Sequence, residues 1–135
     1  MNKDQAVKTA AKWWADRLKA KRPHSNGDSS AASVFACIFA DMGTDSVNDD
    51  QLERFKAEVI SEINAFMDRF GDRYVSVGCD YGPDMILSPA AKKVGIKPLN
   101  FPFKTHLSII KRDDVYEVQV YDGYGARPEK LQPCE

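Results

Sequence analysis

The residues best suited to chemistry lie around a Gly-Pro turn in the second half of the chain. Asp80 and Asp84 flank Gly82-Pro83, and two carboxylates at this spacing can ligate a hard cation or share a proton. With His106 as a base, they would form the site of a small metal-dependent or acid–base enzyme. An Asp at such a turn more often caps the backbone N–H groups that follow it, so a structural role stands beside the catalytic one.

A cysteine nucleophile is the second chemical hypothesis. Cys79 directly precedes Asp80, and His106 begins a later strand of the same predicted sheet. A thiolate nucleophile needs a nearby base and a group that orients that base. However, Cys79 continues the alternation of Val75 and Val77, which predicts a side chain in the core, where cysteines usually serve packing.

The sequence contains no motif of an established cofactor or metal site. It has no P-loop, no GxGxxG and no GxSxG. The possible zinc ligands show no paired spacing; they are His24, Cys37, Cys79, His106 and Cys134. We therefore predict no cofactor, no metal and no catalytic residue beyond the candidates Asp80, Asp84 and His106, and we favour a protein without catalysis.

Charge is segregated along the chain although the net charge is only −1. Residues 1–22 hold seven basic and two acidic side chains, and residues 41–62 hold seven acidic and two basic ones. Such segregation steers partners, although charge runs are usually solvated helix faces. The acidic run could mimic a nucleic-acid backbone toward a basic protein, which makes Asp49, Asp50 and Glu53 candidate contacts.

Aromatic residues gather in the predicted turns of the C-terminal half. Tyrosines at loop tips are good interface anchors, so we add Tyr81, Tyr124 and the neighbouring Arg127 to the predicted contact residues. The alternative is that these aromatics close the open face of a small sheet. The whole set of turn aromatics is Tyr81, Phe101, Phe103, Tyr121 and Tyr124.

Nucleic acid and a second copy of the chain are two further kinds of partner that the sequence brings into question. The N-terminal helix is basic and Trp13 could stack on a base, but nucleic-acid modules are usually basic overall and this chain has a pI of about 6.1. Direct nucleic-acid binding is therefore not favoured. A homodimer that buries Trp13 and the aromatic loops stays open.

The elements that position these residues begin with three helices. Apolar residues at helical spacing predict a helix over 4–21, with Val7, Trp14 and Leu18 on its buried stripe. A nearly all-apolar segment predicts a buried helix over 29–42. Asn48 and Gln51 form a capping box before a helix over 49–70.

After Gly71 the hydrophobic period changes to two, which predicts strands. We expect strands over 74–79, 104–111 and 115–121, with a hairpin turn at 112–114. Ser88 and Pro89 suit the start of a short inserted helix that Gly95 closes. The fold class is therefore α+β: three N-terminal helices packed on a small, mostly antiparallel three-stranded sheet, with a loop-like tail over 122–135.

Length and composition fit one domain over residues 1–135, with a helical part at about 4–70 and a sheet part at about 74–121. No apolar run approaches the roughly 20 residues of a membrane helix, and the first residues lack the apolar core of a signal peptide. Three cysteines without a CxxC pair favour a reducing compartment. We expect a cytoplasmic protein with no membrane partner.

Several short pieces together resemble small bacteriophage and prophage proteins. The resemblance is carried by Trp13-Trp14, Asp80-Tyr81-Gly82-Pro83, Ala90-Ala91, Gly95-Ile96, Phe101-Pro102-Phe103-Lys104-Thr105 and Gly123-Tyr124-Gly125-Ala126. It implies an accessory protein of a mobile element, located in the cytoplasm of the bacterial host. By analogy it also implies an inhibitor of host defence, including the anti-CRISPR class, whose partner is a host complex that binds nucleic acid.

Overall fold

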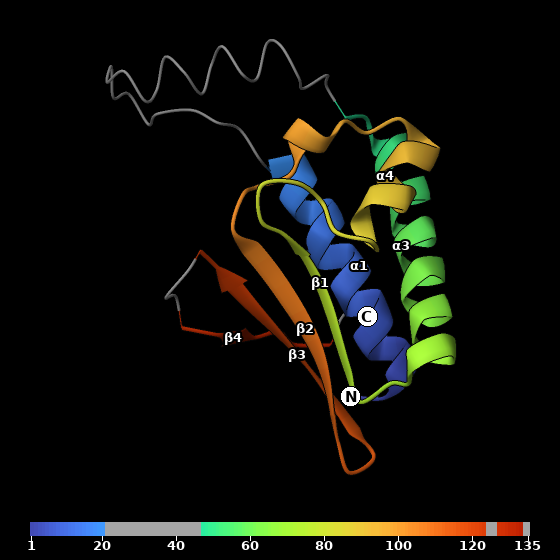
Figure 1. Cartoon of the computed structure of the whole chain (residues 1–135), viewed down its shortest axis with the longest axis vertical. Helices are drawn as coiled ribbons and strands as arrows, with labels where there is room; N and C mark the ends of the chain where they lie inside the picture. The colour runs from blue at the N-terminus through green and yellow to red at the C-terminus, as the bar shows by residue number, and fades with distance from the viewer. Residues whose placement is uncertain (21–46, 124–126, 134–135) are drawn as a thin grey trace.

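The chain folds into a layer of helices packed on one face of an antiparallel sheet (Figure 1). The structure, a computed structural model, describes residues 1–20, 47–123 and 127–133. This confirms the α+β class. The helix predicted over 29–42 lies outside the described residues.

Helix α1 spans Lys3–Ala20, one residue earlier than predicted. Asn2 and Gln5 bond to each other's backbone N–H at 2.8 and 3.0 Å, in the manner of a capping box. The predicted stripe is buried against the sheet and against α3. It consists of Val7, Ala11, Trp14 and Leu18.

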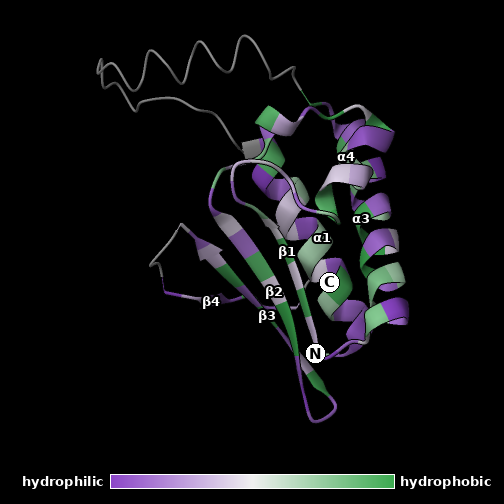
Figure 2. Ribbon diagram, viewed as in Figure 1, coloured by the Kyte–Doolittle hydropathy of each residue, from purple (hydrophilic) through white to green (hydrophobic). Residues whose placement is uncertain are grey.

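Helix α3 spans Asp49–Phe70 and has the predicted boundaries. Its capping box is present: the Asn48 side chain accepts from the Gln51 N–H at 2.7 Å, and Gln51 Oε1 accepts from the Asn48 N–H at 3.1 Å. Gly71, at φ 95°, ends the helix and donates to the Met67 carbonyl. Figure 2 shows hydrophobic residues on the inner side of α3 and hydrophilic ones on its outer side. The buried set is Leu52, Phe55, Val59, Ile63 and Met67.

The sheet has four antiparallel strands in the order β1-β2-β3-β4, where three were predicted. β1 is Tyr74–Cys79, β2 is Thr105–Arg112, β3 is Val115–Asp122 and β4 is Glu129–Lys130. The tail predicted to be loop-like thus contributes a strand, with Lys130 opposite Gln119. Two charged residues carry no alternating apolar pattern, so a periodicity argument cannot find β4.

Helix α4 spans Leu87–Val94 and begins one residue before the predicted cap, Ser88. The side chain that accepts its first N–H groups is Asp84, from Ile86 and Leu87 at 2.9 Å each. Gly95, at φ 79°, closes the helix as predicted. A 3₁₀ turn, η1 at Pro98–Asn100, then leads back toward the sheet.

Phe101 joins the helices to the sheet in the core. It was expected among the exposed turn aromatics but is buried. Its ring lies 6.1 Å from that of Trp14 and 5.9 Å from that of Phe55, between centroids. Tertiary packing of two helices creates this pocket, which local turn chemistry does not reveal. Among the described residues, no helix is both long and apolar enough to cross a membrane.

Candidate functional site

The candidate residues lie mainly at one end of the molecule, which we call the loop end. It consists of the end of α1, the start of α3, the loop 80–86 and η1 (Figure 1). Two contacts join its helices: Lys19 Nζ lies 3.5 Å from Asp49 Oδ1, and Gln51 Nε2 donates to the Val94 carbonyl at 3.0 Å. The loop end therefore belongs to the packed body of the protein.

Asp84 holds the loop 80–86 in place. One carboxylate oxygen accepts from the Gly78 N–H at 2.7 Å, and the other accepts from the N–H groups of Ile86 and Leu87. The backbone N–H of Asp84 also donates to the Gly78 carbonyl at 3.0 Å. Burial raises the pKa of Asp84, while the three backbone donors oppose that rise. Both carboxylate oxygens thus serve the fold, as the capping alternative predicted.

Asp80 and His106 form a pair on the outer face of the sheet, the face without helices. His106 Nε2 lies 2.9 Å from Asp80 Oδ1. His106 stands directly across the ladder from Gly78, and this neighbour without a side chain leaves room for the imidazole ring. The pair is partly exposed to solvent. A carboxylate that orients a histidine is the arrangement required of a general base.

Cys79 does not join this pair. It lies opposite Thr105 rather than His106, so its side chain points to the helix-covered face and is fully buried. Burial, with smaller effects from the Asp84 and Asp80 carboxylates, raises the pKa of the Cys79 thiol to about 11. A buried, protonated thiol on the opposite face from the histidine is not an activated nucleophile.

Tyr81 forms an aromatic pair with Phe103 at the loop end. The ring centroids are 5.9 Å apart in an edge contact, and Lys104 Nζ lies 5.8 Å from the centre of the Tyr81 ring. Tyr81 is 69% exposed and Phe103 is 50% exposed. The Lys104 N–H donates to the Asp80 carbonyl at 2.9 Å, which ties the two aromatic segments together. The pair is therefore held in place while its surface stays open.

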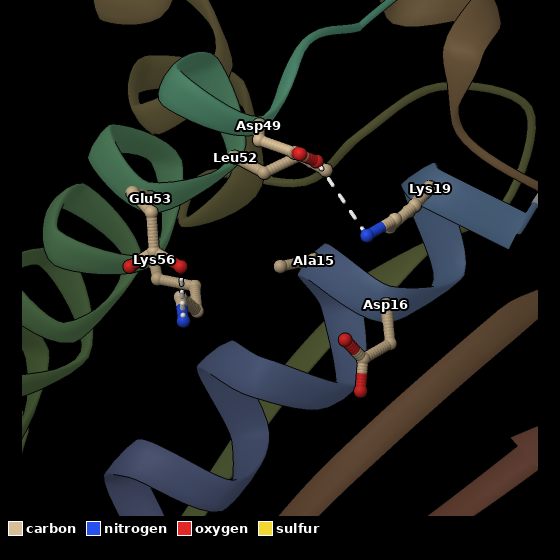
Figure 3. Close-up of a pocket in the computed structure, with 7 residues that line it drawn as sticks. All are labelled: Ala15, Asp16, Lys19, Asp49, Leu52, Glu53 and Lys56. Carbon is tan, nitrogen blue, oxygen red and sulfur yellow. Dashed lines mark ion pairs between the residues drawn. The ribbon is translucent and has the colours of Figure 1, made fainter.

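The predicted acidic contacts lie in the first turns of α3, beside a shallow pocket of about 300 Å³ between α1 and α3 (Figure 3). Asp49 and Glu53 line it, together with Lys19 and Lys56. Each predicted acidic contact has a basic neighbour. The ion pairs are Asp49–Lys19, Asp50–Arg54 and Glu53–Lys56, at 3.5, 3.1 and 2.9 Å.

The remaining predicted contacts are Arg127 and Tyr124. Arg127 is exposed and precedes β4, at the opposite edge of the sheet from β1 and Tyr81. Tyr124 lies outside the described residues. The pairings of Tyr81 with Phe103 and of Asp49 with Lys19 were not predicted, because these partners are far apart in the sequence. The Asp50–Arg54 and Glu53–Lys56 pairs have the i,i+4 and i,i+3 spacing of neighbours on one helix face, and this spacing is visible in the sequence. Within the described ranges, no group of three or more His, Cys, Asp or Glu residues could hold a metal ion.

Comparison with protein families, with characterised proteins and with solved structures finds no match for this chain.

Proposed function

We propose that this chain is a protein-binding factor without catalytic activity, and that the loop end contacts its partner. The observation that carries the proposal is the Tyr81–Phe103 pair, two exposed aromatic rings held by backbone bonds on a packed surface. Large aromatic side chains that are already ordered lose little entropy on binding and are typical hot spots.

The environments of the candidate catalytic side chains support binding rather than catalysis. The Asp84 oxygens are occupied by three backbone N–H groups, and the Cys79 thiol is buried on the other face of the sheet. Of the predicted catalytic candidates, Asp80 and His106 are therefore the two that reach the surface together.

The partner we infer is a protein with a basic surface. Asp49, Asp50 and Glu53 are highly exposed, and their ion pairs lie at the surface. Exposed pairs contribute only about 0–1 kcal/mol each, so these carboxylates can exchange Lys19, Arg54 and Lys56 for cations of a partner. Proteins that handle nucleic acid carry such cations. The resemblance to phage proteins makes a host defence complex in the bacterial cytoplasm, such as a CRISPR-Cas complex, the first candidate, and inhibition the expected effect.

The test is capture of a partner from host lysate with a tagged protein and three variants. Tyr81→Ala with Phe103→Ala removes the aromatic pair. Asp49→Lys, Asp50→Lys and Glu53→Lys together reverse the acidic turn. A control with the same change of charge reverses three exposed acids away from the loop end: Asp68, Asp113 and Asp114.

We expect one stoichiometric protein to bind the wild type and the control, and to be lost from both loop-end variants and at high salt. A partner retained by both loop-end variants would contradict this contact surface. If no partner is captured and the protein is a stable monomer, the binding proposal fails.

A second candidate function rests on the Asp80–His106 pair, whose 2.9 Å contact suits a general base. This alternative is a small acid–base or metal-dependent enzyme acting at the outer face. An Asp80→Asn, His106→Ala variant that keeps full biological activity would eliminate it.

A further inference from the structure

Strand β1 forms one edge of the sheet. β1 pairs with β2 on one side, and within the described part of the chain no strand pairs with its other side. Successive residues of an antiparallel strand direct their N–H and C=O groups alternately to the two sides. Gly78 directs both to the open side, where Asp84 binds them. Tyr74 and Ser76 therefore also direct theirs to the open side.

The N–H and C=O groups of Tyr74 and Ser76 make four backbone groups that point to the open side. Among the described residues, no backbone hydrogen bond is made by Tyr74 or Ser76 toward the open side. The Ile86 N–H turns back to the Asp84 side chain, so the loop does not continue as a strand along β1. The open edge thus runs from Tyr74 to Ser76 and ends where Asp84 begins to cap Gly78.

The open edge lacks the features that protect edge strands. Proteins block such edges with short strands, charged side chains or proline. The opposite edge has all three, since β4 is the two charged residues Glu129–Lys130 and follows Pro128. β1 reads Tyr-Val-Ser-Val-Gly-Cys and contains neither a charge nor a proline.

Exposed apolar side chains flank this edge. Phe70, four residues before β1, is 61% exposed, and Met85, next to Asp84, is 68% exposed. With Phe66 they line a pocket of about 150 Å³. α3 packs chiefly on α1 and α4 and only lightly on β1, and Figure 1 shows it on the side of β1 away from β2. The apolar surface of the helix layer therefore extends past the last strand.

We propose that the open edge of β1 binds an extended segment of the partner protein, which adds to the sheet as a further strand. The inference rests on the proposed binding function and assigns it a second contact. Backbone bonds to Tyr74 and Ser76 would hold the segment, and every second side chain would cover Phe66, Phe70 and Met85.

Positive charge near the start of β1 indicates which side chains the bound segment should carry. Arg73 is exposed and directly precedes the strand, and the Arg69 guanidinium lies 5.4 Å from the centre of the Phe70 ring. An acidic side chain at that end of the added strand would meet both cations. The fitting ligand is an extended peptide with alternating apolar residues and an acidic side chain at the end that lies beside Arg73.

A substitution at Ser76 tests the proposal. Ser76→Pro removes an N–H that points to the open side and leaves the bonds of β1 to β2 intact. Ser76→Ala is the matched control because it keeps the N–H. The probe is a displayed library of random peptides selected on the wild-type protein. We expect the selected peptides to alternate apolar residues, to bind the wild type and Ser76→Ala, and to lose binding to Ser76→Pro with an unchanged circular dichroism spectrum.

Amide hydrogen exchange in the wild type gives a readout that does not depend on a variant. The N–H groups of Tyr74 and Ser76 should exchange rapidly in the free protein and slowly with a selected peptide bound, while that of Gly78 is protected in both. Equal peptide binding by Ser76→Pro would overturn the proposal, as would Tyr74 and Ser76 amides already protected in the free monomer or protected by dimerisation.

The result of this test can be distinguished from the result of the partner-capture test of the proposed function. If Ser76→Pro captures the host partner as well as the wild type does, the edge proposal fails and the loop-end proposal stands. If lysate yields no partner, the binding function fails whether or not library peptides add to β1.

Discussion

Gly78 and His106 face each other across the β1–β2 ladder so closely that position 78 has no room for a side chain. A Cβ at Gly78 would lie 2.2 Å from His106 Nδ1 and 3.0 Å from Cγ. The two residues form a pair that shares no ladder hydrogen bonds, and such pairs bring side chains closest. The imidazole therefore lies over the Gly78 backbone and extends its Nε2 to Asp80.

Gly78→Ala should destabilise the protein by about 1–3 kcal/mol, because the His106 ring must leave its position to admit the methyl group. Urea unfolding monitored by circular dichroism measures this. In a His106→Ala background the same substitution should cost much less, and the difference is the coupling energy of the pair. An equal cost in both backgrounds would show that the backbone, not His106, requires glycine.

Asp84→Asn should lower the free energy of unfolding by roughly 1–3 kcal/mol. The amide oxygen can still accept from Ile86 and Leu87, but the NH₂ group then faces the Gly78 N–H, donor against donor. Asp84→Ala should cost more, since all three acceptor contacts disappear. Asp68→Asn, at an exposed position, is the control. Wild-type stability of Asp84→Asn in urea would argue against the capping role.

The free energy of unfolding should decrease at acid pH because the Asp72 carboxylate becomes protonated. The Tyr116 hydroxyl donates to Asp72 Oδ2 at 2.6 Å, and Lys111 Nζ lies 3.5 Å from the same oxygen. The Tyr116 bond, and then Lys111, hold the pKa of Asp72 below its usual 3.8.

A carboxyl with a lowered pKa stabilises the fold above its usual pKa and loses that contribution as pH falls through its folded pKa. Asp72→Asn should thus be less stable than the wild type at neutral pH, and the gap should close as pH drops below 3.8. Urea midpoints at several pH values would show it. A gap independent of pH would contradict the assignment.

Cys79 should be inert while the protein is folded. Its thiol is buried and its pKa is raised to about 11, chiefly by burial. In a chain with Cys37→Ser and Cys134→Ser, a thiol-specific reagent at neutral pH should label Cys79 only after urea unfolds the protein. Rapid labelling of Cys79 in the folded chain would contradict this prediction and would favour Cys79 as a nucleophile.

Several elements of the fold could be predicted from local patterns. The stripe from Leu52 to Met67, the Asn48–Gln51 capping box and Gly71 determine α3, since each acts within one or two helical turns. The alternation of Val75, Val77 and Cys79 likewise placed Cys79 in the core. The two-residue strand β4 could not be predicted, because its two charged residues carry no alternating apolar pattern. The burial of Phe101 could not be predicted either, because its ring partners Trp14 and Phe55 are distant in the sequence.

The sequence by itself determined the helix and strand types and the presence of carboxylates, a histidine and aromatics in the turns. Only the tertiary structure decided which residues these groups contact. It turned Asp84 inward to three N–H groups, put Cys79 and His106 on opposite faces and joined Tyr81 to Phe103. The physical reason is that periodicity and capping depend on residues a few positions apart in the sequence. Strand register and ring contacts arise only when distant segments pack together.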